Sequence, residues 1–277
     1  MDVAVLGTGR MGSHLVRHLL EGGHDVRVWN RTAERTEPLV DAGARAAATP
    51  AEAVEGADAV VTVLFGPPSV RQTVLDPGVL PAGVLWLDVT TVGPDDADGF
   101  ARRAEEAGVR YVAAPVIGSM KPAAAGELGV LLGGADADVA AARELVALWG
   151  AQEKIREVGA PRNAAAGKLV ANLSLAVAMQ GVAEALTFAG DVGLDRATTL
   201  ALLSGGVLAP IVGAKQTQLD EQEFDDAEFT ADALAKDLEL VLEASLGLHA
   251  VQAAHESLQA AQDDERGSAD FSVITDV

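Results

Sequence analysis

A glycine-rich turn near the start of the chain constrains the fold more than any other feature of the sequence. The apolar run Val3–Leu6 leads into the turn, and residues 11–20, which have helical periodicity, follow it. In a strand–turn–helix unit with G-x-G-x-x-G spacing, the glycines permit a tight turn, close approach of the backbone to a pyrophosphate, and close helix–strand packing. The N–H groups at the helix start can then bind the anion, so we expect dinucleotide binding here and not a merely structural turn. The turn consists of Gly7, Thr8, Gly9, Arg10, Met11 and Gly12.

Short apolar runs alternate with amphipathic segments through the first half of the chain, which is typical of βαβ units around a parallel sheet. After about residue 159 the pattern is helical only. We therefore predict an α/β fold: an N-terminal Rossmann dinucleotide-binding domain (1–160) followed by an all-α C-terminal domain (161–277), with a long interdomain helix. The predicted strands are Val3–Leu6, Val26–Trp29, Ala59–Leu64, Val84–Leu87, Val109–Val112 and Leu128–Leu132. The predicted helices of the second domain cover 163–189, 196–203, 210–219 and 231–260.

Composition restricts the partners that such a chain can have. The formal net charge of -21 argues against nucleic acid or an anionic membrane surface. The chain has no cysteine, which excludes disulfides, thiolate metal sites and thiol nucleophiles. No targeting segment precedes the first strand, and Asn172, Gln180 and Glu184 interrupt the apolar stretch 170–190 at a high cost in lipid. We therefore expect a cytoplasmic protein with no membrane partner, in which that stretch is a buried helix.

The end of the second predicted strand indicates which dinucleotide is bound. An NAD-preferring site usually has an acidic residue here, which binds the 2′-hydroxyl of the ribose. This chain has Asn30 instead, followed by Arg31 and Thr32, whose guanidinium and hydroxyl groups can bind a 2′-phosphate. We therefore predict a preference for NADPH; the alternative is that Arg31 is only a surface residue beside a helix.

Lys168 is the residue whose surroundings point to acid–base chemistry. Lysine is scarce, since only five of the twenty basic residues are lysines. Lys168 and Asn172 lie four residues apart in the long helical segment, so they share one face, and most of their neighbours are small or apolar. Burial in a dry cleft would lower the pKa of the amine toward the working range of a general acid. The alternative, which composition leaves open, is an ordinary lysine that reaches water near a helix end.

Five short motifs follow one another along the chain: GxGxMG at 7–12, VWNRT at 28–32, APV at 114–116, GKxxxN at 167–172 and KDL at 236–238. Together they resemble, in the same order, the motifs of the β-hydroxyacid dehydrogenases. That family includes 3-hydroxyisobutyrate dehydrogenase, tartronate semialdehyde reductase and the glyoxylate/succinic semialdehyde reductases. The resemblance covers essentially the whole chain, down to the tail 270–274.

The resemblance implies roles for individual residues. The catalytic lysine of the family corresponds to Lys168, and its assisting asparagine corresponds to Asn172. A second lysine, near the active site and among the cofactor-binding residues, corresponds to Lys236. The positions beside the nicotinamide correspond to Leu64, Phe65 and Thr91.

The loop that the resemblance assigns to the substrate departs from the family pattern. Many relatives have an acid and a serine where this chain has Ala113 and Ile117. Backbone N–H groups at Gly118 and Ser119 can still bind a carboxylate, and the Ser119 hydroxyl can donate a hydrogen bond. Residues 118–128 most resemble the glyoxylate/succinic semialdehyde reductase branch, whereas Ile117 favours a less polar substrate. The expected substrate-binding residues are Pro115, Ile117, Gly118, Ser119, Lys168 and Asn172.

We therefore predict an NADPH-dependent oxidoreductase that transfers a hydride between the nicotinamide and the carbonyl carbon of a small hydroxyacid or aldehyde acid, with Lys168 as general acid/base. The imine reductases share this architecture, although they usually have aspartate or tyrosine at the position of Lys168. Reduction of a less polar imine or ketone is therefore the first alternative, and a non-catalytic NADPH-binding protein is the second. The five histidines have no ligand-like spacing, so no metal is expected. The resemblance and the long apolar helix imply a homodimer at least.

Overall fold

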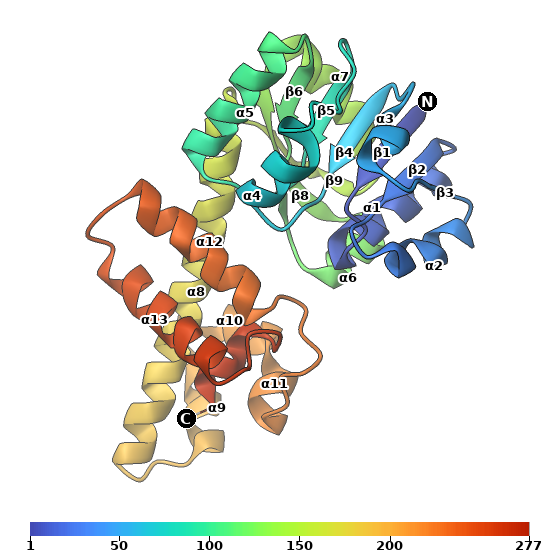
Figure 1. The fold of residues 1–277 in the computed structure, drawn as a ribbon. Helices are drawn as coiled ribbons and strands as arrows, with labels where there is room; N and C mark the ends of the chain where they lie inside the picture. The colour runs from blue at the N-terminus through green and yellow to red at the C-terminus, as the bar shows by residue number, and fades with distance from the viewer. Residues whose placement is uncertain (277) are drawn as a thin grey trace. The chain divides into compact units, whose positions relative to one another are not determined.

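The computed structural model describes residues 1–276, and its N-terminal part is built on a nine-stranded sheet (Figure 1). The strand order is β3-β2-β1-β4-β5-β6-β8-β7, and β9 pairs with β8. The pairs from β3 to β6 are parallel, whereas β8 runs antiparallel to β6 and β7. The strands are β1 (Asp2–Leu6), β2 (Asp25–Trp29), β3 (Arg45–Ala46), β4 (Ala59–Thr62), β5 (Leu85–Asp88), β6 (Arg110–Ala113), β7 (Val116–Ile117), β8 (Leu128–Gly134) and β9 (Gly150–Glu157).

Helices cover both faces of this sheet because its central strands are apolar on both sides. In β1, Val3 and Val5 pack into one core cluster with α1 and α7, while Ala4 and Leu6 pack into a second cluster with α3 and α5. The carboxyl ends of β1, β4, β5 and β6 therefore meet at one edge, where the loops that follow them lie close together. The helices of this part are α1 (Arg10–Glu21), α2 (Glu37–Val40), α3 (Pro50–Val54), α4 (Pro67–Val70), α5 (Pro94–Glu106), α6 (Met120–Ala125) and α7 (Asp136–Val146).

The chain divides by its contacts into two units, Met1–Lys168 and the residues from Leu169 onward. The second unit has its own core, formed by apolar residues of its helices and of the C-terminal segment. The division falls inside α8, so Lys168 belongs to the same unit as the sheet. The remaining helices are α8 (Pro161–Asp191), α9 (Arg196–Ser204), α10 (Ala209–Ala214), α11 (Gln216–Glu221), α12 (Ala231–Ala244) and α13 (His249–Asp263).

The predicted α/β class, with a parallel sheet followed by helices, is confirmed, but several element predictions were wrong. The helix predicted over 210–219 is two helices, because the backbone of Lys215 leaves the helical region between α10 and α11. The helix predicted over 231–260 breaks after α12, where Ser245 is extended and Gly247 has a positive φ. After α13, residues Phe271–Thr275 form a 3-10 helix.

α8 is the one helix among the described residues that is long and apolar enough to cross a membrane by length and composition alone. Its most apolar 18-residue window has a mean hydropathy of 1.5, and 39% of that window is buried. Leu169, Met179 and Val182 contribute to the core of the second unit. Core helices of water-soluble proteins meet the same criterion, so this is weak evidence for a membrane span. The helix expected from the sequence is therefore present, but only part of it is buried.

Candidate functional site: the carboxyl edge of the sheet

The glycine turn joins β1 to α1 as the motif requires. Gly7 has a φ of +104°, and a Cβ there would lie 2.2 Å from the carbonyl oxygen of Val63. A Cβ at Gly12 would lie 2.1 Å from the carbonyl oxygen of Gly7, so neither position accepts a side chain. A Cβ at Gly9 would meet nothing within 4 Å, which leaves space above the backbone at the start of α1. The N–H groups at this helix start have no side-chain cap, and the turn therefore fits a bound pyrophosphate.

Asn30 connects the glycine turn to the residues that follow β2. Its Oδ1 accepts a hydrogen bond from the backbone N–H of Thr8 (3.1 Å), and its Nδ2 donates to the carbonyl oxygen of Thr32 (2.8 Å). Arg31 and Thr32 are exposed just beyond this link. Arg35 was missed by the sequence analysis: it is exposed on the next turn, and its carbonyl oxygen accepts a hydrogen bond from the Thr8 hydroxyl (3.4 Å). A basic residue four positions after Arg31 was the available signal.

The loops after β4 and β5 lie beside the glycine turn at the same edge. The backbone N–H of Leu64 donates a hydrogen bond to Thr90 Oγ1 (3.1 Å), which ties the two loops together. Leu64 and Thr91 are partly buried, while Phe65 is 59% exposed. The three residues that the family resemblance assigns to the nicotinamide therefore come from two joined loops.

The loop after β6 holds the residues expected to bind substrate. Pro115 is buried, and Ile117, which is 38% exposed, pairs with Gly129 in β8. Gly118 has a φ of +133° and approaches Leu128 closely, so a side chain there would be strained. Ser119 is the N-cap residue of α6, but its side chain makes no capping hydrogen bond to the helix. Its hydroxyl can therefore serve another partner.

The first turns of α8 pack on the sheet of the first unit, and this fixes the backbone that carries Lys168. A Cβ at Gly167 would lie 2.6 Å from a methyl group of Leu131, and Ala164 and Ala165 are buried in the same core cluster. Arg162 forms an ion pair with Asp98 of α5. Lys168 follows directly and is half-buried, in the same unit as the glycine turn.

Asn172 and Lys236 come together in the second unit through the middle residue of the KDL motif, Asp237, to which the sequence analysis gave no role. Asp237 is 2% exposed; it accepts a hydrogen bond from Asn172 Nδ2 and forms an ion pair with Lys236. A buried carboxylate therefore holds the amide of Asn172, which is itself 5% exposed. The only sequence signal was the position of Asp237 directly after Lys236.

The histidines near the glycine turn have structural contacts. His18 Nε2 lies 2.8 Å from the carbonyl oxygen of Ala123, which links α1 to α6. Burial lowers the pKa of His14, and the neighbouring His18 and Arg17 lower it further. Within residues 1–276 no group of three or more His, Asp or Glu side chains could hold a metal ion.

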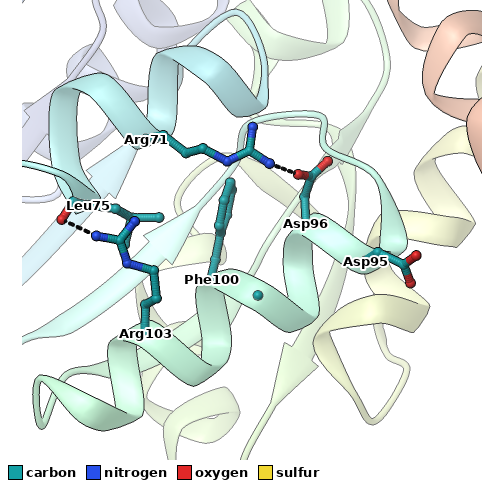
Figure 2. A pocket seen from close by; sticks show the side chains of 7 residues that line it. Arg71, Leu75, Asp95, Asp96, Phe100 and Arg103 are labelled. Atoms are coloured by element: carbon teal, nitrogen blue, oxygen red, sulfur yellow. Dashed lines mark hydrogen bonds and ion pairs between the residues drawn. The ribbon is translucent and has the colours of Figure 1, made fainter.

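A hollow of about 120 Å³ lies between α5 and the π-helical turn 71–75 of the first unit (Figure 2). Two arginines line it, but both are engaged: Arg71 with Asp96, and Arg103 with Asp76 and the carbonyl oxygen of Leu75. Because these guanidinium groups are already paired, the hollow offers little attraction for an anionic ligand. The candidate site is therefore the open carboxyl edge of the sheet.

Two family models match the sequence. The model for the NAD binding domain of 6-phosphogluconate dehydrogenase matches residues 2–159. The model for the NAD-binding region of NADP-dependent 3-hydroxyisobutyrate dehydrogenase matches residues 163–277. The chain is 30% identical to the uncharacterized oxidoreductase YfjR of Bacillus subtilis, over 88% of this chain and 87% of that protein. It is also 30% identical to glyoxylate/succinic semialdehyde reductase 1 of Arabidopsis thaliana, over 99% and 97%.

Solved structures with the same architecture include 3-hydroxyisobutyrate dehydrogenase of Mycobacterium tuberculosis with L-serine. That structure has a TM-score of 0.86 and 25% identity, covering 99% of this chain and 98% of that one. An imine reductase variant from Myxococcus stipitatus, in complex with NAD+, has a TM-score of 0.69 and 21% identity over 99% of this chain and 98% of that one. The second likeness is one of fold alone.

Proposed function

Because the chain belongs to the 3-hydroxyisobutyrate dehydrogenase family of NAD(P)-dependent oxidoreductases, we propose that it uses NADPH to reduce the carbonyl group of a small aldehyde acid. The observation that carries this proposal is that Lys168 is anchored in the same unit as the glycine turn, by the close packing of Gly167 on Leu131. A lysine amine in the unit that carries the glycine turn can donate a proton to an alkoxide as it forms.

The choice of NADPH rests on the residues beyond β2. Asn30 is used to hold the turn, and no carboxylate stands at its position to bind a ribose 2′-hydroxyl. Arg31, Thr32 and Arg35 are exposed around this point and offer guanidinium and hydroxyl donors to a 2′-phosphate. In a chain with a net charge of -21, the two guanidinium groups supply the local positive potential that an anionic cofactor needs.

The residues of this chain then have separate tasks. The bound cofactor supplies the hydride from C4 of its nicotinamide. Lys168 donates a proton to the carbonyl oxygen, and its charge stabilises the alkoxide as it forms. The backbone N–H groups at Gly118 and Ser119, with the Ser119 hydroxyl, bind the substrate carboxylate. Asp237 holds the side-chain amide of Asn172, the residue that the family resemblance assigns to assist Lys168.

An aldehyde acid is favoured over the alternatives by the substrate loop and by the lysine. The relative from Arabidopsis thaliana is named a glyoxylate/succinic semialdehyde reductase, and the loop 118–128 resembles that branch. The 38% exposure of Ile117 supports a second candidate, the reduction of a less polar imine, because an apolar side chain stands where relatives have a donor.

The first test is NADPH oxidation by the purified protein, with succinic semialdehyde and 1-pyrroline compared in parallel. We expect faster turnover of the aldehyde acid; faster turnover of 1-pyrroline would instead support the imine reductase. Lys168→Ala should lower kcat by about 100-fold or more, because a positioned general acid contributes at least that much. Lys154→Ala, which removes an exposed lysine, is the matched control.

The same proteins, assayed for both NADPH oxidation and NADPH binding, test the role of Lys168 and the non-catalytic alternative. The affinity of Lys168→Ala for NADPH should remain within about twofold of the wild type, since the lysine is expected to act on the substrate oxygen. Near-normal turnover by this variant would contradict the proposed role. Tight NADPH binding without oxidation by either compound would favour a protein that binds the cofactor without turnover.

A further inference from the structure

We propose that Asp88 and Thr90 form a buried support that positions the two loops assigned to the nicotinamide end of the cofactor. This inference rests on the proposed cofactor function. Neither residue is a catalytic residue in this account, because each acts through others: Thr90 on the loop that carries Leu64 and Phe65, and Asp88 on Thr90.

Asp88 lies at the last position of β5, 1% exposed, and collects donors from three neighbouring segments. Its Oδ1 accepts hydrogen bonds from the Thr62 hydroxyl (2.7 Å) and from the backbone N–H of Thr90 (3.1 Å). The Trp86 indole N–H donates in turn to Thr62 Oγ1 (2.9 Å), which fixes that hydroxyl as a donor to the carboxylate. The ends of β4 and β5 are therefore joined beneath the carboxyl edge.

Tyr111 of β6 completes the set on the opposite side. Its hydroxyl donates to Asp88 Oδ2 at 3.5 Å, a long and weak hydrogen bond. Burial and the neighbouring Asp88 raise the pKa of Tyr111 well above its usual value, so the hydroxyl keeps its proton. Tyr111 contacts the same carboxylate as Thr90, but no hydrogen bond connects it to either loop among those found in the described residues.

Thr90 transmits the support to the loop after β4. Its Oγ1 accepts the hydrogen bond from the backbone N–H of Leu64 (3.1 Å), and its own backbone N–H donates to Asp88 Oδ1 (3.1 Å). Leu64 is thus fixed by its main chain, and Thr91 is fixed because it follows Thr90 directly. Two successive hydrogen bonds, from Thr90 to Asp88 and from Leu64 to Thr90, therefore connect the carboxylate to both loops.

The burial of this carboxylate is costly for the fold, which argues that it has a local task. Burial raises the pKa of Asp88 to about 6, even though hydrogen bonds from Thr62, Thr90 and Tyr111 act in the opposite direction. An apolar residue at the end of a buried strand would avoid this penalty. A carboxylate offers two oxygen atoms that accept several hydrogen bonds at once, which is what holding two loops together requires.

The proposed support acts on one half of the cofactor only. The glycine turn, Arg31 and Thr32 are assigned to the adenosine half, while Leu64 and Thr91 are assigned to the nicotinamide half. Loosening the support should therefore weaken the binding of NADPH but not that of adenosine 2′,5′-bisphosphate, which has no nicotinamide. A general loss of domain structure would weaken both ligands together.

The experiment measures the Kd of both ligands by calorimetry, for the wild type and for matched variants of the full chain. Thr90→Val removes the acceptor for Leu64 while it keeps the side-chain shape, and it should raise the Kd for NADPH about fivefold or more. The Kd for adenosine 2′,5′-bisphosphate should stay within about twofold. Thr90→Ser should restore NADPH binding, and Tyr111→Phe should leave both affinities within about twofold, since it removes only the weak contact.

Asp88→Ala is the second variant and keeps the test decisive where Thr90→Val fails to fold. It should weaken NADPH binding selectively, because it removes the oxygen atom that accepts from the Thr62 hydroxyl and from the Thr90 backbone N–H. Unchanged NADPH binding in Thr90→Val and Asp88→Ala would overturn the inference, and so would equal weakening of both ligands. Wild-type protein that binds neither ligand would overturn the cofactor assignment and the inference with it.

Discussion

Arg31 is the residue on which the choice between NADPH and NADH depends most directly. A guanidinium group that binds a 2′-phosphate makes charge-assisted hydrogen bonds, each of which contributes about 1.5–3 kcal/mol. Arg31→Ala should therefore raise the Kd for NADPH about tenfold or more and leave the Kd for NADH nearly unchanged. Fluorescence titration with both cofactors measures this, and Arg45→Ala, which removes an arginine paired with Asp2 and Asp25, is the control. Equal affinity changes for the two cofactors would contradict the prediction.

The ionisation of Asp88 should also make the stability of the protein depend on pH. Burial raises its pKa from an ordinary value of 3.8 to about 6, so the folded state binds the proton more tightly than the unfolded state between these pH values. Above pH 6 the ionised, buried carboxylate therefore lowers the free energy of unfolding by about 3 kcal/mol. This cost disappears as the pH falls through 6 toward 4, because the carboxylate is then protonated.

Asp88→Asn isolates this contribution because the amide does not titrate. The free energy of unfolding of the wild type, relative to that of the variant, should increase between pH 8 and pH 4. Urea unfolding at several pH values measures the difference for both proteins. A constant difference over this range would show that Asp88 has the same pKa in the folded and unfolded states.

At the scale of elements, the glycine turn offers a matched pair of substitutions. Gly12→Ala places a Cβ 2.1 Å from the carbonyl oxygen of Gly7, which belongs to the backbone and cannot move aside, so it should destabilise the protein. Gly9→Ala meets nothing within 4 Å, so its free energy of unfolding should change by less than about 1 kcal/mol. It should nevertheless weaken NADPH binding about tenfold or more, because the Cβ occupies the space above the turn.

Thermal unfolding and NADPH titration of both glycine variants separate the two effects. Substitution of alanine at Gly206, where the nearest atom to the added Cβ is at 3.7 Å in the second unit, controls for the change itself. If Gly9→Ala lost stability as Gly12→Ala does, or bound NADPH as tightly as the wild type, the space above the turn would not be the cofactor site.

The elements that the sequence predicted well are those with a strong local signal. The buried strands β1 and β4 are apolar runs, and β2 alternates buried with less buried residues; the structure has all three within a residue or two of the predicted bounds. β9 was missed because most of its residues are polar and exposed, so neither an apolar run nor an alternation marks it. Segments 210–219 and 231–260 were each predicted as a single helix because their apolar spacing continues across a break. The breaks are visible only in the backbone conformation of Lys215 and of Ser245.

Site residues could likewise be predicted where their signal is local in the sequence, and not where it depends on distant partners. A turn motif lies within one short segment, so the sequence could identify Gly7, Gly9 and Gly12 directly. Asp88 and Asp237 could not be identified as buried carboxylates, because their partners are Thr62 on a neighbouring strand and Asn172 on another helix. Ordinary aspartates on the surface of an acidic chain have the same sequence appearance.

At the scale of the whole molecule, α8 exposes two large apolar side chains that water solvates poorly. Val170 is 58% exposed and Phe188 is 67% exposed, and they lie about five helical turns apart, on the same face of α8. Val192, just beyond the end of α8, is 61% exposed. A second copy of this chain would cover such a stripe, so the homodimer that the sequence predicts remains our expectation.

Light scattering after size-exclusion chromatography should therefore give a mass of about twice the 28.3 kDa of one chain. Phe188→Glu should shift the protein toward the monomer, because a charge in the middle of an apolar interface is left without a partner. Leu246→Glu is the control: this leucine is 93% exposed between α12 and α13, and its replacement should leave the mass unchanged. A dimer that persists in Phe188→Glu but dissociates in Leu246→Glu would show that the interface lies at the α12–α13 junction. A monomeric wild type would contradict the predicted homodimer.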